Sequence, residues 1–328
     1  MENLDQFIAE WHDDSPTLLV HTSGSTGTPK PMLAEKRRME ASARLTCNFL
    51  GLKPGDTALL CLPLQYIAGK MMVVRALTCG LRLVSVEPQG HPLAASAGGL
   101  TRVDFAAMVP LQVWNSLQEP RECKRLATIR QLIIGGGAID ERLAHELRSF
   151  PNAVWSTYGM TETLSHIALR RLSGPEASEW YTPFEGVGLS LSPDRCLVID
   201  APYLCDGPLT TNDIAELRPD GRFRILGRRD NVICSGGVKI QIEQVEQRLR
   251  PCLPGVPFLI TKSPSESLGE QVVMLTEMTD VEHLLAVCRR VLPRYEQPRR
   301  IVTVDRLPFT PNGKPARREA ELLAASGA

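Results

Sequence analysis

The chain has 328 residues, 43% of them apolar and 23% charged, which predicts about two globular domains. The 37 Lys and Arg residues balance 37 Asp and Glu residues, so neither a nucleic-acid-binding surface nor an acidic solvating tail is indicated. No apolar run reaches the roughly 20 residues of a membrane span, and residues 1–5 carry acids where a secretory signal carries basic residues. The nine cysteines form no Cys-x-x-Cys pair, which favours reduced thiols in a cytoplasmic protein.

Short apolar runs alternate with longer helical patterns through roughly the first 190 residues. We expect strands at 17–21, 58–62, 81–86, 105–109, 131–134 and 154–157. We expect helices at 32–49, 69–78, 111–117 and 140–150, the last of them capped by Asp140. Alternation of strands and helices predicts an α/β domain, in which a mainly parallel sheet is flanked by helices.

The pattern changes after about residue 190. Two short strands, 197–199 and 222–226, are expected to be joined through the turn 219–221, and the polar segment 227–230 predicts a flexible connection. Beyond it we expect a helix, two strands, a helix and a strand at 242–250, 257–261, 271–275, 281–291 and 300–304. The prediction is a large domain of residues 1–229 and a small, mobile α+β domain of residues 230–328.

A loop of small polar residues follows the first predicted strand, and Lys30 closes it. Its glycines allow close approach of the backbone and its hydroxyls donate hydrogen bonds, so the loop suits an oligophosphate. Pro29 stands where a Walker A loop requires glycine, which disfavours P-loop NTPase chemistry; a plain surface linker is the alternative. The nucleotide-binding residues expected here are Thr22, Ser23, Gly24, Ser25, Thr26, Gly27 and Lys30.

This loop resembles the phosphate loop of the adenylate-forming superfamily, which includes acyl- and aryl-CoA synthetases, luciferases and the adenylation domains of peptide synthetases. Further motifs of the superfamily follow in the same order, and the resemblance covers roughly residues 17–318. It implies a large domain with a small C-terminal lid. It also implies activation of a carboxylic acid by ATP, with Mg²⁺ as cofactor and coenzyme A as co-substrate.

The motif Tyr-Gly-Met-Thr-Glu-Thr, residues 158–163, follows the predicted strand 154–157. It therefore lies at the carboxyl end of a strand, where open α/β sheets bind ligands. By resemblance, Tyr158 and Gly159 lie against adenine, Thr161 contacts the α-phosphate and Glu162 helps to hold Mg²⁺. A hard carboxylate oxygen suits that metal role.

Three further motifs complete the nucleotide site by resemblance. The glycine run Gly135, Gly136 and Gly137 follows a predicted strand and is placed beside adenine and the acyl group. Asp213, in Thr-Asn-Asp, resembles the carboxylate that accepts from the ribose hydroxyls, although Asn212 stands where glycine is commoner. Arg228 is assigned to the ribose or the phosphates, and Asp230 to the hinge of the small domain.

Lys314, within Pro-Asn-Gly-Lys-Pro, resembles the C-terminal lysine that completes adenylation. Attack of a carboxylate on the α-phosphate brings two anions together, and a cation between them offsets the repulsion. A lysine on a mobile domain can arrive for one half-reaction and leave for the other. The alternative is an exposed loop lysine without a role. We predict Lys314, Thr161 and Glu162 as the catalytic residues.

Arg75 gives an indication of the acid substrate. It lies in an otherwise apolar predicted helix, and a buried cation there needs an anionic partner. An arginine at this spacing resembles the o-succinylbenzoate–CoA ligases of menaquinone synthesis, whose substrate carries a second carboxylate. Tyr66, in the place of a superfamily histidine, and His166 are assigned to the same acyl pocket. The Ser-Gly-Gly that ends in Gly236 and Gly237 is a second similarity, and both glycines are assigned to CoA binding. A snorkelling arginine is the alternative.

One departure concerns the first part of the chain: relatives carry a much longer segment ahead of the phosphate loop, which here begins at Thr22. One wall of the usual acyl site is therefore expected to be absent or rebuilt. Pro31 also stands where glycine is commoner.

These observations together predict an AMP-forming ligase that joins an aromatic dicarboxylic acid, 2-succinylbenzoate, to CoA through an acyl-adenylate, with pyrophosphate released. Three alternatives stay open: a generic aryl- or acyl-CoA ligase for a monocarboxylic acid, a non-catalytic nucleotide-binding remnant, and an adenylation domain serving a carrier protein. No nucleic-acid partner is expected, and the sequence carries no signal of oligomeric state.

Overall fold

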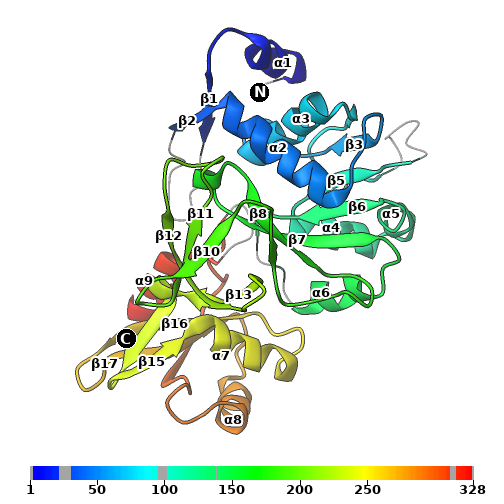
Figure 1. The fold of residues 1–328 in the computed structure, drawn as a ribbon. Coiled ribbons are helices and arrows are strands. Elements are labelled where there is room, and N and C mark those ends of the chain that lie inside the picture. Colours follow the sequence, from blue (N-terminus) through cyan, green and yellow to red (C-terminus); the bar gives the residue numbers. More distant parts are fainter. Residues whose placement is uncertain are drawn as a thin grey trace. The chain divides into compact units, whose positions relative to one another are not determined.

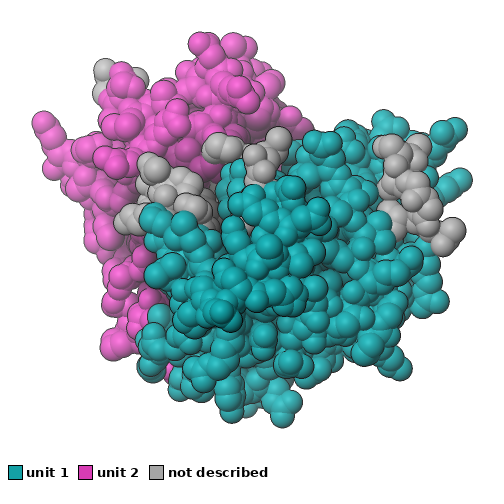
Figure 2. Space-filling view, turned by 90° about the horizontal axis from the view of Figure 1, so that it is seen from above, with its two compact units in different colours: residues 1–189, 199–209, 218–223 teal, residues 190–198, 210–217, 224–328 magenta. Residues whose placement is uncertain are grey.

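A computed structural model describes residues 3–21, 31–94, 102–137, 139, 141–310 and 315–326. Its contacts divide the chain into two compact units, each described here by itself (Figure 2). Unit 1 comprises residues 1–189, 199–209 and 218–223, and unit 2 comprises residues 190–198, 210–217 and 224–328. The boundary between a large domain and a lid at Asp230 stays a prediction. None of the helices among the described residues is long and apolar enough to cross a membrane.

A seven-stranded sheet organises unit 1 (Figure 1). Its order is β4-β3-β5-β6-β7-β8-β9, where the first five strands are parallel neighbours and β8 and β9 extend the sheet antiparallel. The strands are β3 Thr57–Leu60, β4 Arg82–Ser85, β5 Phe105–Met108, β6 Gln131–Ile134, β7 Ala153–Gly159, β8 His166–Arg171 and β9 Thr182–Pro183. The prediction of a mainly parallel sheet is confirmed.

Helices cover both faces of this sheet, because successive side chains of a strand point to opposite sides. Phe105 and Ala107 of β5 pack with α2 and α3 in one core cluster, whereas Ala106 and Met108 pack with α4, α5 and α6 in another. Glycine in the left-handed conformation ends both α2 and α3, at Gly51 and Gly80. The helices of unit 1 are α1 Leu4–His12, α2 Lys36–Leu50, α3 Ile67–Cys79, α4 Pro110–Gln118, α5 Pro120–Leu126 and α6 Glu141–Arg148.

The expected helix 32–49 was wrong at its start. Strand β2, Pro31–Glu35, pairs antiparallel with β1, Thr17–His21, and the helix begins only at Lys36. Pairing with β1 satisfies the backbone groups of residues 31–35, and the Lys36 N–H donates to the Pro16 carbonyl at 2.9 Å. Leu33 on this strand is 67% exposed.

A four-stranded sheet has the order β10-β11-β12-β13. Its strands are β10 Gly188–Leu191, β11 Cys196–Asp200, β12 Leu209–Leu217 and β13 Phe223–Arg228. Strand β12 was not predicted, because its polar residues 210–213 show no apolar alternation. The turn 219–221 therefore joins β12 to β13, and not the two strands that the sequence indicated. The segment 227–230, expected to be irregular, instead ends β13 and begins the one-turn helix η2, Arg229–Asn231.

The remainder of unit 2 is a small α+β assembly, as predicted. Its five-stranded sheet has the order β15-β14-β17-β16, with β18 paired to β17. Helices α7 and α8 pack on one face, and α9 packs on the other through Ala320 and Ala324. The elements are β14 Val232–Ser235, β15 Val238–Gln241, α7 Ile242–Leu249, η3 Arg250–Cys252, β16 Phe258–Ser265, β17 Gly269–Thr276, α8 Val281–Val291, β18 Arg300–Thr303 and α9 Arg317–Ser326.

Candidate active site

A tight turn follows β7 and presents the predicted phosphate and metal residues. Strand β7 runs two residues beyond the expected end, so Tyr158 and Gly159 close it, and Thr161 and Glu162 stand in the one-turn helix η1, Thr161–Thr163. The register of β7 against β8 shifts at Gly159. A Cβ atom on Gly159 would lie 2.4 Å from backbone atoms of Ser165 and His166, so only glycine fits. The motif therefore has a backbone reason for its glycine.

Tyr158 belongs to an aromatic cluster within unit 1. Its ring centroid lies 5.7 Å from that of Tyr181 and 5.1 Å from that of Phe223, both at tilted or edge-on angles. The Tyr181 hydroxyl lies 2.9 Å from the Ser156 Oγ atom on β7. Packing of this kind restricts the Tyr158 ring to one orientation. Its contact with adenine stays a prediction.

The glycine run after β6 lies against the neighbouring strand. The Gly135 N–H donates to the Met108 carbonyl at 3.1 Å, and a Cβ atom on Gly135 would lie 2.5 Å from the Thr157 Oγ1 atom of β7. Gly136 has a φ of +78°, which favours glycine. The structure thus brings the glycine run and the end of β7 together, as the predicted adenine site requires.

Glu162 lines a cavity of about 490 Å³ in unit 1. Arg38, on the same lining, pairs with Glu35 at 3.1 Å and with Asp206, and its hydrogen bond with Asp206 raises the pKa of this guanidinium. The remaining lining comes mostly from β2, Leu164 and the segment 204–209. Strand β2 directly follows the predicted phosphate loop in the sequence.

The Glu162 carboxylate is exposed, and within the described ranges it makes no ion pair. One hard oxygen ligand fits Mg²⁺, since that ion takes most of its ligands from phosphate oxygens and water in nucleotide sites. No cluster of three His, Cys, Asp or Glu residues that could hold a metal occurs in the described part of the chain. Glu162 could therefore hold the ion together with phosphate oxygens of the nucleotide, and this role stays a prediction.

Arg75 is buried in α3, with 2% of its surface exposed. One terminal nitrogen donates to the Ser165 Oγ atom at 2.7 Å, and the other lies 4.0 Å from the Met72 sulfur. Its Nε atom has no hydrogen-bond partner, and no carboxylate of the described residues pairs with the guanidinium. Burial lowers the pKa of Arg75 to about 10, against the opposing effect of the nearby thiols Cys47 and Cys79.

His166 lies beside Arg75 and is buried. Its Nε2 atom is 3.1 Å from the Thr46 Oγ1 atom, and its Nδ1 atom is 3.3 Å from the Ser165 Oγ atom. Burial, and then the charge of Arg75, lower the pKa of His166 well below its usual range. The structure therefore brings Arg75 and His166 together, whereas Tyr66 stands apart from them as the half-buried N-cap residue of α3.

Sequence reasoning missed Ser165 and Thr46, which link these two predicted residues. Ser165 directly precedes His166 in the chain, and Thr46 is fully buried on α2. A polar residue on the apolar face of α2 was the available signal, because such a residue needs a hydrogen-bond partner.

Two thiols adjoin the same cluster. The side chains of Cys47 on α2 and Cys79 on α3 hydrogen-bond to each other, and the Cys79 sulfur also lies 3.9 Å from the Ala43 carbonyl oxygen. The hydrogen bond with Cys79, together with burial, raises the pKa of Cys47. The hydrogen bond from Cys47, together with the charges of Arg44 and Arg75, lowers the pKa of Cys79 to about 7. All nine cysteines are free.

In unit 2, the predicted ribose and hinge residues meet through one arginine. Arg228 donates to Asp213 at 3.1 Å and to Asp230 at 2.9 Å. Burial lowers the pKa of Arg228, but the hydrogen bond with Asp230 and the charge of Asp213 outweigh it and raise the pKa. The Gln241 side-chain amide donates to the Arg228 carbonyl at 2.8 Å, which secures the end of β13. These roles in nucleotide binding stay predictions.

Gly236 and Gly237 form the two-residue turn of the β14–β15 hairpin. Their φ angles are +56° and +83°, the combination that a tight hairpin turn requires and that glycine adopts most readily. The turn therefore explains both glycines structurally, and their contact with CoA stays a prediction. The phosphate-loop residues 22–30, Asp140 and Lys314 lie outside the described residues.

The family is settled by comparison with known proteins. A family model described as "AMP-binding enzyme" matches residues 3–208, more than half of the chain. The chain belongs to this family of adenylate-forming enzymes. The expectation of an AMP-forming acid–CoA ligase agrees with that membership and with the names of its relatives.

One curated relative is the 2-succinylbenzoate–CoA ligase of Haemophilus influenzae, 25% identical over 325 residues that cover 91% of this chain and 69% of the relative. A crystal structure from Dyadobacter fermentans, described as an acyl-CoA synthetase (AMP-forming)/AMP-acid ligase II-like protein, is 35% identical with a TM-score of 0.66. That likeness covers 95% of this chain and 91% of the other.

The o-succinylbenzoate–CoA synthetase of Bacillus subtilis, in complex with ATP and magnesium ion, has a TM-score of 0.75 at 23% identity. This likeness covers 92% of the present chain and 69% of that protein, and it shows the fold. The fold predicted for the adenylate-forming superfamily is thereby confirmed. The chain spans about two thirds of the length of these ligases.

Proposed function

We propose that the chain is a 2-succinylbenzoate–CoA ligase of the AMP-forming type. In the first half-reaction, a carboxylate oxygen of the acid attacks the α-phosphorus of ATP, so that an acyl-adenylate forms and pyrophosphate leaves. In the second, the CoA thiol loses its proton and attacks the acyl carbon, and AMP leaves. No protein nucleophile takes part, since the adenylate is itself the activated acyl group. Membership of the family and the named relatives support this reaction class.

The choice of 2-succinylbenzoate as the acid rests on the buried Arg75. A guanidinium that is 2% exposed, with an unpartnered Nε atom and no carboxylate beside it in the described ranges, is costly unless an anion joins it. A dicarboxylic acid can place one carboxylate at phosphorus and the other at Arg75. Charge-assisted hydrogen bonds of this kind are about twice as strong as neutral ones. A fatty acid or benzoate has no second anion to offer.

The residues assigned to the nucleotide site act mainly through their positions and their charges. Thr161 and Glu162 stand in the turn at the carboxyl end of β7, where an α-phosphate and its Mg²⁺ would bind; the ion, when bound, offsets phosphate charge. Lys314 supplies a cation between the two reacting anions in the first half-reaction. Asp213 and Arg228, which contact each other, hold the ribose, and the small domain turns about Asp230 between the half-reactions.

The test is pyrophosphate exchange into ATP, measured with radiolabelled pyrophosphate and a panel of acids. We expect exchange with 2-succinylbenzoate, and exchange at least tenfold weaker with benzoate or a fatty acid. Arg75→Gln removes the charge and should raise the KM for 2-succinylbenzoate about 10- to 100-fold, since a hydrogen bond to a charged group contributes about 1.5–3 kcal/mol.

Arg82→Gln is the matched control. Arg82 is the first residue of β4 and contacts Thr57, so its loss should leave the KM for the acid unchanged. Equal exchange with benzoate would overturn the choice of substrate. An Arg75→Gln variant with the wild-type KM would remove the role of this arginine.

A further inference from the structure

A continuous chain of hydrogen bonds links α2 to Arg75 through His166. Thr46 contacts the Ser42 carbonyl oxygen at 3.1 Å and the His166 Nε2 atom at 3.1 Å. The His166 Nδ1 atom lies 3.3 Å from the Ser165 Oγ atom, which in turn accepts from Arg75 at 2.7 Å. Five residues from α2, α3 and the segment after β7 thus share one network.

The two ends of this network fix the direction of every bond within it. A guanidinium only donates, so the Ser165 oxygen accepts from Arg75, and its single proton is available to the His166 Nδ1 atom. A backbone carbonyl only accepts, so the Thr46 proton goes to Ser42. The Thr46 oxygen must therefore accept, and the His166 Nε2 atom carries the proton. His166 is neutral, in the tautomer protonated at Nε2.

Burial protects this arrangement from water. Thr46 is 0% exposed, Arg75 2% and His166 7%, so solvent does not compete for these three side chains, while Ser165 is half-buried. A proton added at His166 Nδ1 would force Ser165 to accept from both Arg75 and His166, with its own proton displaced. The network therefore has one stable arrangement, in which the Arg75 terminal nitrogen is held and its Nε atom stays unpartnered.

We propose that Thr46 and His166 are positioning residues: they fix the Ser165 hydroxyl as an acceptor and thereby hold the Arg75 guanidinium in one orientation for the distal carboxylate of the acid. The inference rests on the proposed function. It changes the expected role of His166, because both of its ring nitrogens are engaged by the protein. His166 acts on the substrate through Ser165 and Arg75, and it does not bind the acid itself.

The first test separates KM from kcat in adenylate formation from 2-succinylbenzoate. Thr46→Val keeps the shape of the side chain but removes the acceptor of the Nε2 proton. We expect the KM for the acid to rise about fivefold, the size of effect that one neutral hydrogen bond supports, with kcat and the KM for ATP changed less than about twofold. Thr46→Ser should restore the KM to within about twofold of wild type.

Thr57→Val is the matched control, since Thr57 is a buried threonine of β3 that contacts Arg82, outside the network. Its KM for 2-succinylbenzoate should equal that of the wild type. An unchanged KM in Thr46→Val, or a Thr46→Ser variant no better than Thr46→Val, would overturn the proposal.

The second test needs no substrate. Nitrogen-15 NMR of histidine-labelled protein reports the tautomer of each of the six histidines, and His166→Gln identifies the His166 signals by their loss. We expect a proton on Nε2 and none on Nδ1 between about pH 6 and pH 8. A proton on Nδ1, in place of or beside that on Nε2, would overturn the network.

The outcomes also distinguish the two proposals. If the wild-type protein forms no adenylate from 2-succinylbenzoate, the proposed function falls, and the positioning role falls with it. If the wild type forms the adenylate while Thr46→Val keeps its KM, only the positioning role falls.

Discussion

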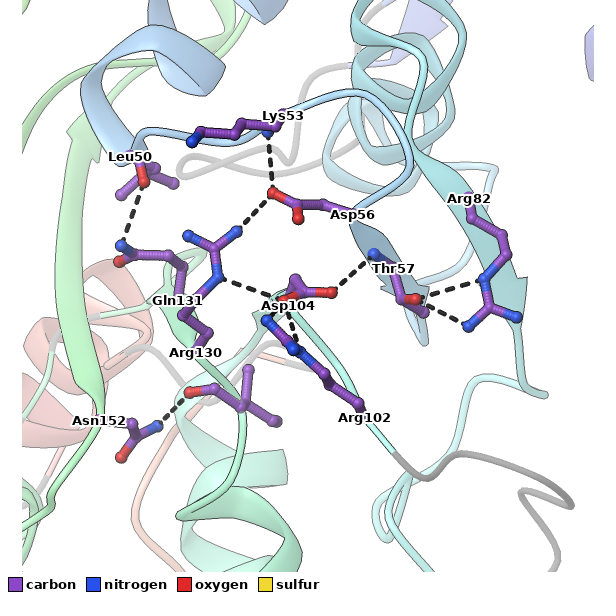
Figure 3. Close-up of polar contacts among 11 residues, drawn as sticks. Leu50, Lys53, Asp56, Thr57, Arg82, Arg102, Asp104, Arg130, Gln131 and Asn152 are labelled. Atoms are coloured by element: carbon purple, nitrogen blue, oxygen red, sulfur yellow. Dashed lines mark hydrogen bonds and ion pairs between the residues drawn. The ribbon is translucent and has the colours of Figure 1, made fainter.

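The seven-stranded sheet has an amino edge, where its parallel strands begin, and a carboxyl edge, where they end. Charged side chains are paired differently at these two edges. At the amino ends of β3, β5 and β6, acids and arginines pair with one another (Figure 3). Asp104 accepts from the Thr57 N–H at 3.0 Å and from Arg130 at 3.2 Å, and Arg130 also pairs with Asp56. Beyond the carboxyl end of β7, Glu162 makes no ion pair within the described ranges, and neither does Arg75, which reaches this region from α3 through its contact with Ser165.

We expect this difference to separate charges that stabilise the fold from charges that bind a ligand. Buried polar groups are normally satisfied inside a protein, and the amino edge follows that rule. At the carboxyl edge, glycines that allow close approach lie near charges that make no ion pair within the described residues, which is typical of a functional site. Four predictions test whether the two edges divide stability and activity in this way.

The largest effect is expected at Glu162. Glu162→Gln removes the carboxylate assigned to the metal, and kcat for adenylate formation should fall about 100- to 1000-fold, as it does when one transition-state electrostatic contact is lost. The exposed carboxylate contributes little to folding, so the thermal unfolding midpoint should stay unchanged. Glu176→Gln, another exposed glutamate of unit 1, should keep wild-type activity. A Glu162→Gln variant within tenfold of wild type would contradict the assignment.

The amino edge should show the opposite behaviour. The Asp104 side chain is 7% exposed, and Asp104→Ala leaves the Thr57 N–H without its acceptor and Arg130 with Asp56 alone. The free energy of unfolding in urea should fall by about 1–3 kcal/mol, the cost of leaving a buried N–H group without an acceptor. At temperatures where the variant is folded, its kcat and KM should match the wild type. Loss of activity with unchanged stability would contradict a purely structural role for Asp104.

The two edges should also lose stability in different pH ranges. The pKa of His166 is lowered in the folded protein, so its neutral form stabilises the fold above pH 6.5 and this contribution declines as the pH falls below that value. The expected loss is about 1.4 kcal/mol for each pH unit. His166→Gln should flatten this part of the urea stability profile, and a profile of unchanged slope would contradict a buried neutral His166.

For Asp104, burial raises the pKa, but hydrogen bonds from Thr57 and Arg130 outweigh it and hold the pKa below 3.8. Its stabilising contribution should therefore be complete above pH 3.8 and decline only below it. Asp104→Ala should accordingly leave the slope between pH 6.5 and pH 5.5 unchanged, which separates the two edges within one experiment.

The smallest effect concerns Cys79, one helical turn from Arg75. Because its pKa is lowered to about 7, alkylation of Cys79 by iodoacetamide should accelerate with a midpoint near pH 7. Cys47→Ser weakens the hydrogen bond to the thiolate and should move the midpoint upward. Site-resolved mass spectrometry follows Cys79 separately from the exposed Cys234 and Cys252. A Cys79 midpoint near pH 9 would contradict the thiol contact.

The sequence predicted elements whose apolar periodicity is strong and local. Strand β6 and helix α8 have the expected bounds, because their side chains pack in cores that a simple pattern records. Strand β2 was missed, since its pairing with β1 depends on a distant segment, and β12 was missed because its first residues are polar. Pairing between strands is set by tertiary contacts, which local patterns do not contain.

The candidate site was likewise predicted only in part from the sequence. Motifs gave Tyr158, Glu162 and Arg75, because chemistry restricts those residue types. They did not give the contact of Gly135 with Thr157, or the link from Thr46 to His166, which joins residues 120 positions apart. Such contacts exist only once the sheet and its helices have assembled, so no spacing rule could have supplied them.

The most direct measurement is mass-spectrometric detection of the reaction products when the protein is given ATP, Mg²⁺ and 2-succinylbenzoate without CoA. We expect 2-succinylbenzoyl-adenylate together with pyrophosphate, and the conversion of that adenylate into the thioester and AMP once CoA is added. Release of ADP in place of AMP, or an adenylate formed equally well from benzoate, would contradict it.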